Sequence, residues 1–247
     1  MKSDTQLTGE VLTSPNHGSR KAPLDMLLLH YTGMANAAVA LDWLRDPASE
    51  VSAHYLVYEN GRIVQMVEEV QRAWHAGEAS WGGQEDINSR SIGIEIVNPG
   101  HEHGYTAFPE AQVDAVTALC LDIACRREIR PERVLAHSDV ALGRKIDPGE
   151  KFPWNRLATA GVGHWVEPEA IASGRFLQQG AIGQPVEALQ TMLSLYGYGV
   201  PVNGVFDEKT ATVVEAFQRH FRPLKVDGVA DASTITTLHR LLSSLKR

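Results

Sequence analysis

Two histidines and an aspartate stand where a protein could hold a metal ion. His30 ends the apolar run MLLLH and His137 follows the run VLA, so each lies at the tip of an expected buried strand. Asp147 lies in a stretch rich in Gly and Pro, and the Pro-Gly after it predicts a turn that fixes its direction. Two imidazoles and one carboxylate suit a zinc site with one open position. A lone histidine is more often an ordinary core or surface residue, so the three residues must be judged together.

The elements expected around these residues alternate between strand and helix. Beyond the two strands already named, apolar periodicity predicts a helix at 37–44, a hairpin at 53–67 turned by Asn60-Gly61, a strand at 91–97 and a helix at 109–127. A loop rich in Gly, Pro and charge follows His137, from 138 to 153. This pattern predicts an α/β domain with a mixed central β-sheet flanked by helices.

An internal repeat marks a second domain near the C-terminus. The segments VNGVFDEKT and VDGVADAST begin at Val202 and Val226, 24 residues apart. In each copy an aspartate, Asp207 or Asp231, is expected to cap a following helix, and an earlier helix makes three. We therefore expect a catalytic domain at 1–160, a linker at 161–182 and a small all-α three-helix domain at 183–247.

The motifs of the first domain resemble a known family of enzymes. They read LLLHYTG, VSAHYLV, RAWHAG, SIGIEIVN and AHSDVALGRKIDPGEKFPW, between about Leu27 and Trp154. In these segments the chain is similar to the N-acetylmuramoyl-L-alanine amidases of the AmpD and AmiD type, which are related to animal peptidoglycan-recognition proteins. The resemblance implies a zinc hydrolase that cuts the amide bond between N-acetylmuramic or anhydromuramic acid and L-alanine.

The same resemblance implies a role for five residues. It assigns His30, His137 and Asp147 as ligands of one Zn²⁺ per chain, Glu95 as the general base, and Lys145 as the group that stabilises the transition state. Strand alternation in SIGIEIV would by itself also allow Glu95 to face solvent, and Lys145 could be an ordinary solvated loop residue.

Four polar residues near these motifs are candidates for substrate contact. His54 and His75 lie in the VSAHYLV and RAWHAG motifs, although histidines near a cleft are often packing elements. Arg90 and Asn98 flank the strand of Glu95 and could bind carboxylate or amide groups of a peptide stem.

Composition narrows the partners of the chain. Its 247 residues carry a net charge of -7, and the 23 Lys and Arg are dispersed, which argues against nucleic-acid binding. No apolar run is long enough for a transmembrane segment, and no signal peptide is evident, so the chain as written is expected in the cytoplasm. A removed leader would instead place it in the periplasm or at the outer membrane. Oligomeric state is not indicated.

Two other functions remain open at this stage. A non-catalytic peptidoglycan-recognition module would share the fold, and a zinc peptidase acting within the stem peptide could carry the same second domain.

The second domain resembles the three-helix peptidoglycan-binding domain of wall hydrolases, through GVFDEKTATVVEAFQRHF and DGVADASTITTLHRL. It is expected either to tether the enzyme to peptidoglycan or to support the catalytic fold. Both intact peptidoglycan and soluble muropeptides are candidate substrates.

Overall fold

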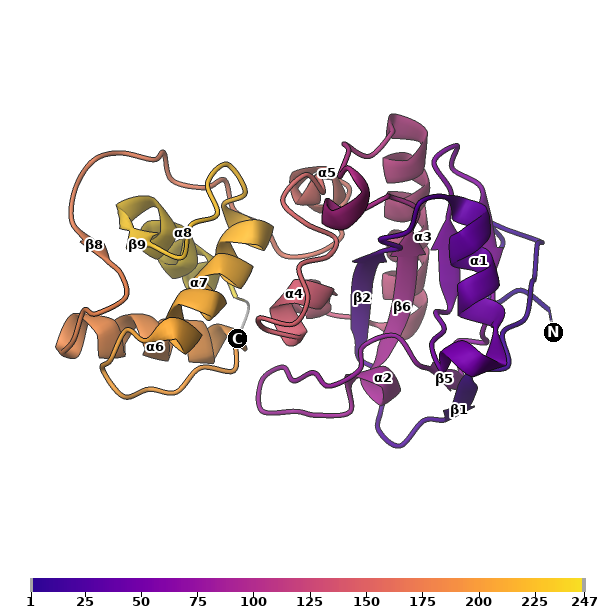
Figure 1. Cartoon of the computed structure of the whole chain (residues 1–247), viewed down its shortest axis with the longest axis horizontal. Coiled ribbons are helices and arrows are strands. Elements are labelled where there is room, and N and C mark those ends of the chain that lie inside the picture. The colour runs from indigo at the N-terminus through magenta and orange to yellow at the C-terminus, as the bar shows by residue number, and fades with distance from the viewer. Residues whose placement is uncertain (1, 246–247) are drawn as a thin grey trace.

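A five-stranded mixed sheet forms the centre of the N-terminal part of the computed structural model, which describes residues 2–245 (Figure 1). The strand order is β4-β3-β6-β2-β7, with the ranges Ile63–Gln65, Tyr55–Val57, Ser91–Ile96, Met26–Tyr31 and Val134–Ala136. β3, β6, β2 and β7 are parallel, and β4 closes the expected hairpin by running antiparallel to β3. The predicted α/β class is confirmed.

Strand register brings the residues that could do chemistry to one edge of the sheet. His30 is paired with Glu95 across β2 and β6. On the other side of β2, Ala136 is paired with Leu29, so His137 follows beside His30. Ligand sites of parallel sheets lie at the carboxyl ends of the strands, and these three residues meet there.

Alternation along β2 separates two cores on opposite faces of the sheet. Leu27 and Leu29 are fully buried in a core that includes α3 (Glu110–Arg127). Met26 and Leu28 belong to a different core on the other face. Because side chains two residues apart share a face, His30 lies on the same face as Met26 and Leu28.

The remaining elements of this part are short. They are β1 (His17–Ser19), β5 (Gln71–Ala73), α1 (Ala37–Arg45), α2 (Ile87–Arg90), α4 (His137–Val140), α5 (Trp154–Thr159) and 3₁₀ turns at Pro47–Ser49, His101–His103 and Pro131–Arg133. The expectation of a plain loop from 138 onward was wrong in its first residues, because α4 forms one helical turn there. The Asp139 side chain accepts a hydrogen bond from the N–H of Ala136 at 2.8 Å and so caps this turn.

The C-terminal part contains three helices, α6 (Gln184–Tyr196), α7 (Glu208–Phe221) and α8 (Ala232–Ser244). The predicted caps are confirmed: Asp207 accepts from the N–H of Thr210 at 2.9 Å, and Asp231 from that of Thr234 at 2.8 Å. None of the helices described between residues 2 and 245 is long and apolar enough to cross a membrane.

The chain that leads into α6 is packed rather than free. Its short strand β8 (Phe176–Leu177) pairs with β9 (Ala230–Asp231), which lies directly before α8. Upstream of β8, Trp165 packs against the core of the three helices. The segment expected to be a linker therefore contributes contacts of its own.

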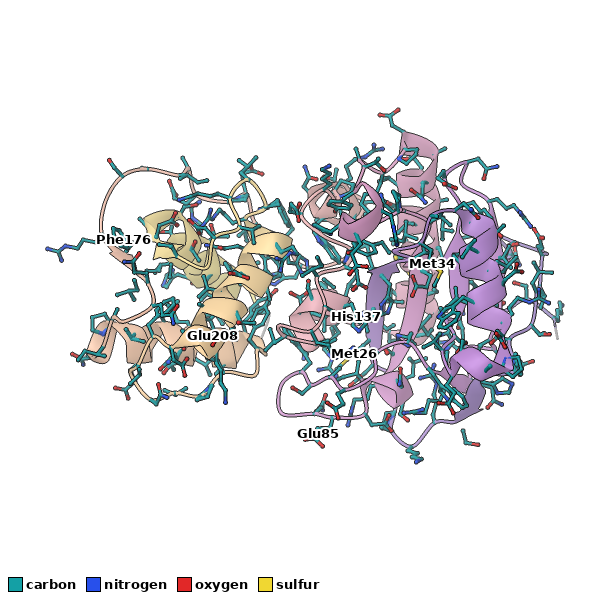
Figure 2. The ribbon with its side chains drawn as sticks, in the orientation of Figure 1. Met26, Met34, Glu85, His137, Phe176 and Glu208 are labelled. Carbon is teal, nitrogen blue, oxygen red and sulfur yellow. The ribbon has the colours of Figure 1, made fainter. Side chains whose placement is uncertain are left out.

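The three-helix module shares a hydrophobic core with the sheet. Val140 and Ala141, in and after α4, belong to the same buried cluster as Phe217 and Phe221 of α7. Figure 1 shows α4 between the sheet and the C-terminal module, and Figure 2 shows side chains filling the space between them. Because this cluster also contains Met26 and Leu28, the module covers the face of the sheet on which His30 lies.

A buried carboxylate ties the end of α3 to the sheet. Glu69 is fully buried and accepts hydrogen bonds from the Tyr55 hydroxyl at 2.7 Å, from Arg126 at 2.8 and 2.9 Å, and from Arg127 at 2.7 Å. Burial alone would raise the pKa of Glu69, but the bonds from Arg126, Tyr55 and Arg127 outweigh it and lower the pKa to about 2.

We expect Glu69 to make stability depend on acid pH. Its carboxyl has an ordinary pKa of 4.5 and a lower one in the folded protein, so its contribution is present above pH 4.5 and is lost as pH falls toward 2. The free energy of unfolding of the metal-free protein, measured in urea, should fall between pH 6 and pH 3. The fall should be about 2 kcal/mol larger in the wild type than in Glu69→Gln. Glu59→Gln, at an exposed turn, is the control and should keep the wild-type difference. Equal pH dependence in all three proteins would contradict this role.

Candidate active site

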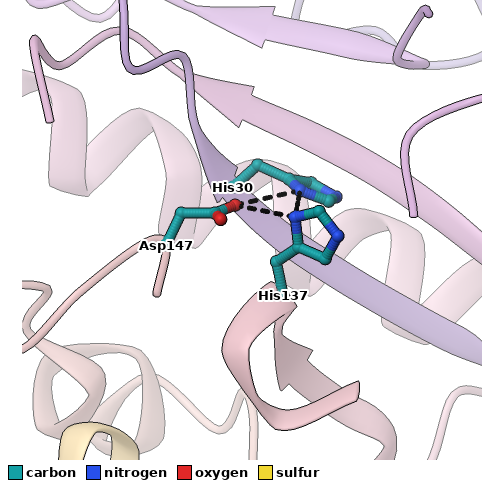
Figure 3. Close-up of side chains that lie close together, drawn as sticks. All are labelled: His30, His137 and Asp147. Atoms are coloured by element: carbon teal, nitrogen blue, oxygen red, sulfur yellow. Dashed lines mark hydrogen bonds and ion pairs between the residues drawn. The ribbon is translucent and has the colours of Figure 1, made fainter. Parts of the chain in front are cut away.

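Three buried side chains converge at the carboxyl edge of the sheet (Figure 3). His30 extends from the end of β2, His137 begins α4, and Asp147 comes from the loop that follows. The Nδ1 atoms of the two histidines are 2.9 Å apart, and Asp147 Oδ2 lies 3.2 Å from that of His30 and 3.0 Å from that of His137. The structure thus brings together all three residues predicted to bind metal.

A directed chain of hydrogen bonds sets which nitrogen of His30 carries its proton. The Ser91 hydroxyl donates to the carbonyl of Ile87 at 2.6 Å, so its oxygen can accept from Nε2 of His75 at 3.3 Å. Nδ1 of His75 then accepts from Nε2 of His30 at 3.0 Å. This assignment leaves Nδ1 of His30 as a lone pair that faces Asp147.

The backbone sets the tautomer of His137 in the same way. Its Nε2 donates to the carbonyl oxygen of Ala76 at 3.0 Å, so in the neutral tautomer that this bond favours Nδ1 carries the lone pair. Arg144 also donates to Ala76 O and to Glu78 O, at 2.5 and 2.7 Å. The loop that carries Asp147 is therefore attached to the segment that orients His137.

A glycine on β6 makes room for the His75 ring. A Cβ atom at position 93 would lie 2.5 Å from Cγ of His75. Gly93 therefore lets this ring lie against the strand backbone and reach His30.

The ionisation of the cluster favours ligand lone pairs. Burial, with a smaller effect of His137, lowers the pKa of His30 to about 4, so this imidazole is neutral at pH 7. Burial opposes ionisation of Asp147, but His137 and His30 outweigh it and hold the pKa of this carboxyl well below its ordinary value. The Nδ1 atoms of His30 and His137 and the Asp147 carboxylate therefore converge at one place, an arrangement of nitrogen and oxygen donors that a cation satisfies.

Glu95 and Lys145 flank this cluster. Glu95 is next to His30 in the sheet, and among residues 2–245 its Oε2 is buried without a hydrogen-bond partner. Burial raises the pKa of Glu95 well above its ordinary value, the charge of Asp147 adds to this effect, and Lys145 opposes it. Lys145 has an exposed side chain, and its N–H donates to the carbonyl of Ala141 at 3.0 Å. Both residues line the same cavity as the histidines.

This cavity has a volume of about 410 Å³ and an amphipathic lining. Its polar floor is formed by the cluster and Glu95. Tyr31, Trp43 and Trp74 add aromatic surface to the walls, and Trp43 is 47% exposed. A pocket of this kind suits a ligand with both polar and apolar groups.

The four candidates for substrate contact lie at different depths. His75 lines the cavity but is 8% exposed and contacts His30. His54 is fully buried, accepts from the N–H of Gly93 at 2.9 Å and lies outside the cavity lining. Burial, with a smaller effect of Arg20, lowers the pKa of His54 to about 3.

Arg90 and Asn98 also lie outside the cavity lining. Arg90 forms an ion pair with Asp25 at 3.2 Å. Asn98 donates to the carbonyl of Thr106 at 3.1 Å and accepts from Gly100 at 3.0 Å, so it shapes the loop at the cavity rim. His54 and Asn98 thus contact residues next to the site, whereas Arg90 lies at the amino end of β6, at the opposite end of this strand from Glu95.

Several lining residues were not identified from the sequence. Trp43 lies on α1, where an apolar residue is usually read as core, so its pattern gave no signal. Trp74 precedes His75 in RAWHAG, and Tyr31 follows His30, so adjacency to the motifs could have indicated both.

Comparison with known proteins agrees with this architecture. Residues 20–150 match the family model described as N-acetylmuramoyl-L-alanine amidase, and residues 182–238 match that of a putative peptidoglycan binding domain. N-acetylmuramoyl-L-alanine amidase AmiD of Escherichia coli strain K12 is 39% identical over 233 residues, which cover 89% of this chain and 82% of AmiD.

Solved structures extend the similarity to both domains. The complex of E. coli AmiD with anhydro-N-acetylmuramic acid-L-Ala-D-gamma-Glu-L-Lys superposes with a TM-score of 0.75, at 37% identity and with 91% of each chain covered. AmpDH3 from Pseudomonas aeruginosa gives a TM-score of 0.72, at 31% identity and with 98% of each chain covered. On this evidence the chain belongs to the N-acetylmuramoyl-L-alanine amidase family, as a hydrolase with a C-terminal peptidoglycan-binding domain.

Proposed function

We propose that this protein hydrolyses the amide bond between N-acetylmuramic or anhydromuramic acid and L-alanine, with one zinc ion per chain held by His30, His137 and Asp147. The observation that carries the proposal is the convergence of three donor atoms inside one cavity, beside a Glu95 carboxylate oxygen that has no hydrogen-bond partner among residues 2–245. The similarity to AmiD, whose structure contains an anhydromuropeptide substrate, supports the choice of bond.

The donor set fits zinc. Imidazole nitrogen and carboxylate oxygen are its common ligands, and three protein ligands leave a position for substrate or water. A zinc ion held there would supply Lewis acidity that activates the scissile carbonyl and the attacking water. The hydrogen bonds from Nε2 of His30 and His137 would orient both rings for this task.

Glu95 is proposed to move the proton. It would take a proton from the attacking water and deliver it to the nitrogen of the leaving L-alanine, which departs as an amine. Its raised pKa suits the first transfer, because the carboxylate is a stronger base than an exposed one. Among the described residues, none forms a hydrogen bond with its Oε2, so this oxygen is free to accept the proton.

Lys145 is proposed to stabilise charge on the carbonyl oxygen. The loop attachment at Ala141 holds its backbone two residues before Asp147, and its side chain lines the cavity. An ammonium group close to the developing oxyanion lowers the transition-state energy more than that of the neutral substrate.

We also propose that residues 1–160 form the catalytic domain, 161–182 the connection and 183–247 a domain that binds peptidoglycan. The matches to family models at 20–150 and 182–238 fall within the first and largely within the last of these ranges. A second binding site would raise the local concentration of polymeric substrate at the cavity.

Product analysis tests the proposed reaction. Mass spectrometry of digests of intact sacculi and of a soluble anhydromuropeptide should show free stem peptides with L-alanine at the N-terminus and the sugar lactyl group as an acid. Cleavage within the stem would identify a peptidase, and binding without products would identify a recognition module. Either result would exclude the amidase reaction for that substrate.

A further inference from the structure

The helical turn α4 links the two ends of the proposed metal site. His137 is its first residue, and the N–H of Ser138 donates to the carbonyl oxygen of Asp147 at 3.0 Å. One backbone bond thus connects the turn that carries one ligand to the residue that supplies another. A turn of four residues is too short to be stable alone, so other parts of the protein must hold it in place.

Asp139 is the residue through which α4 is held. Its side chain is fully buried and is surrounded by three donors. Oδ2 accepts from the N–H of Ala136 at 2.8 Å and from Nδ1 of His220 at 2.6 Å, and Oδ1 accepts from the Tyr198 hydroxyl at 2.7 Å. Tyr198 and His220 belong to the three-helix module, which therefore supplies two of the three donors.

The ring of His220 is fixed by stacking. It lies 3.8 Å from the ring of Trp154, centroid to centroid and nearly parallel, and equally close to that of Phe221. Trp154 begins α5, just after the loop that carries Lys145 and Asp147. His220 therefore touches the chain on both sides of that loop.

Tyr198 is fixed by the tryptophan of a neighbouring loop. Its ring contacts that of Trp81 at a centroid distance of 4.8 Å, and a Cβ atom at Gly197 would lie 2.4 Å from the Trp81 ring. The N–H of Ser80 donates to the carbonyl of Val140 at 2.9 Å, so this loop also holds α4. Burial, together with Asp139, keeps the pKa of Tyr198 well above its ordinary value, so the phenol remains a donor.

We propose that Tyr198 and His220 are positioning residues of the active site, acting through Asp139 to hold α4, and with it His137 and Asp147, in the geometry that binds metal. The peptidoglycan-binding domain is then part of the support of the catalytic centre. This inference rests on the metal site proposed above. The physical reason is that a buried carboxylate that loses a donor moves to find another, and α4 moves with it.

Zinc affinity of the full-length chain tests the inference through a quantity other than activity. In competition with a chromophoric chelator, Tyr198→Phe should weaken zinc binding about fivefold and His220→Leu about tenfold. Tyr196→Phe is the matched control, since Tyr196 lies two residues away and its buried hydroxyl bonds to Nδ1 of His164 at 2.8 Å rather than to Asp139. It should change zinc affinity less than twofold.

A conservative replacement separates positioning from general destabilisation. In His220→Asn the amide can donate from near the place of Nδ1, so zinc affinity should return to within about threefold of the wild type. Thermal unfolding of the metal-free forms should show that all variants fold. On a soluble anhydromuropeptide, Tyr198→Phe should lower kcat and leave KM unchanged.

The outcomes distinguish this inference from the proposed function. Tight zinc binding by the wild type, lost in His30→Ala, together with unchanged affinity in folded Tyr198→Phe and His220→Leu, overturns the positioning role and leaves the metal site intact. Equal weakening in Tyr196→Phe also overturns it, because the effect would then follow from loss of any buried hydroxyl in the module. A wild type that binds no zinc overturns both.

Discussion

Replacing Glu95 with Gln is expected to reduce kcat for the muramoyl-L-alanine amide by about 10²- to 10⁴-fold, the range over which general acid–base catalysis contributes. Gln is nearly isosteric and neutral, so the half-buried position beside His30 remains filled. It cannot accept a proton from water or return one to the leaving amine. Because both transfers occur in the transition state, KM should change little.

Metal content separates this loss from damage to the site. Glu95→Gln should retain one zinc per chain, since Glu95 is outside the set of three converging donors. Glu59→Gln, at the exposed turn of the β3–β4 hairpin, controls for loss of a carboxylate and should have wild-type kcat. Near wild-type turnover by Glu95→Gln would remove Glu95 from the mechanism. Loss of zinc would instead make it part of the metal site.

The sheet edge could be predicted because strands carry a strong local pattern. Short apolar runs ended at His30 and before His137, and parallel strands place their carboxyl ends together. The same rule places Glu95 at this edge, but it does not predict the face of the sheet to which its side chain points. Alternation in SIGIEIV defines two faces, and only the core formed with α3 on the isoleucine face shows that Glu95 points to the other one.

The hydrogen bonds that orient the ligands could not be predicted. The hydrogen bonds from Ser91 to Ile87, from His75 to Ser91 and from His30 to His75 join α2, β6, the segment after β5 and β2, and they depend on distances of about 3 Å. Sequence spacing indicates which residues share a face but not which nitrogen of a ring meets which oxygen.

The contact between the two domains could not be predicted from the sequence either. Three amphipathic helices predict a small bundle with its own core, and nothing in that pattern specifies which outer face meets a partner. The contact depends on single side chains, with Trp81 against Gly197 and His220 against Trp154. The segment at 161–182, where Gly, Ala and polar residues dominate, allowed either a linker or a packed connection, and only the structure shows that Trp165 and β8 pack against the module.

Removing one proposed ligand is expected to have the second large effect. His137→Ala should lose stoichiometric zinc after exhaustive dialysis, while the wild type retains one ion per chain. The free energy of zinc binding at structural sites with four ligands is about 10 to 16 kcal/mol. One ligand contributes roughly a quarter of this free energy, which corresponds to about 10²- to 10³-fold in affinity. Hydrolysis should fall at least as far as the bound zinc. Added zinc should restore little of it, because the ring that orients the ion is gone.

The matched control for this variant is His103→Ala, which removes an exposed histidine outside the cavity lining. It should keep full zinc and full activity. His30→Ala and Asp147→Ala should behave like His137→Ala, since the three donor atoms lie within 4.8 Å of one another and face a common point. If His137→Ala keeps one zinc per chain with wild-type affinity, the ion is held elsewhere.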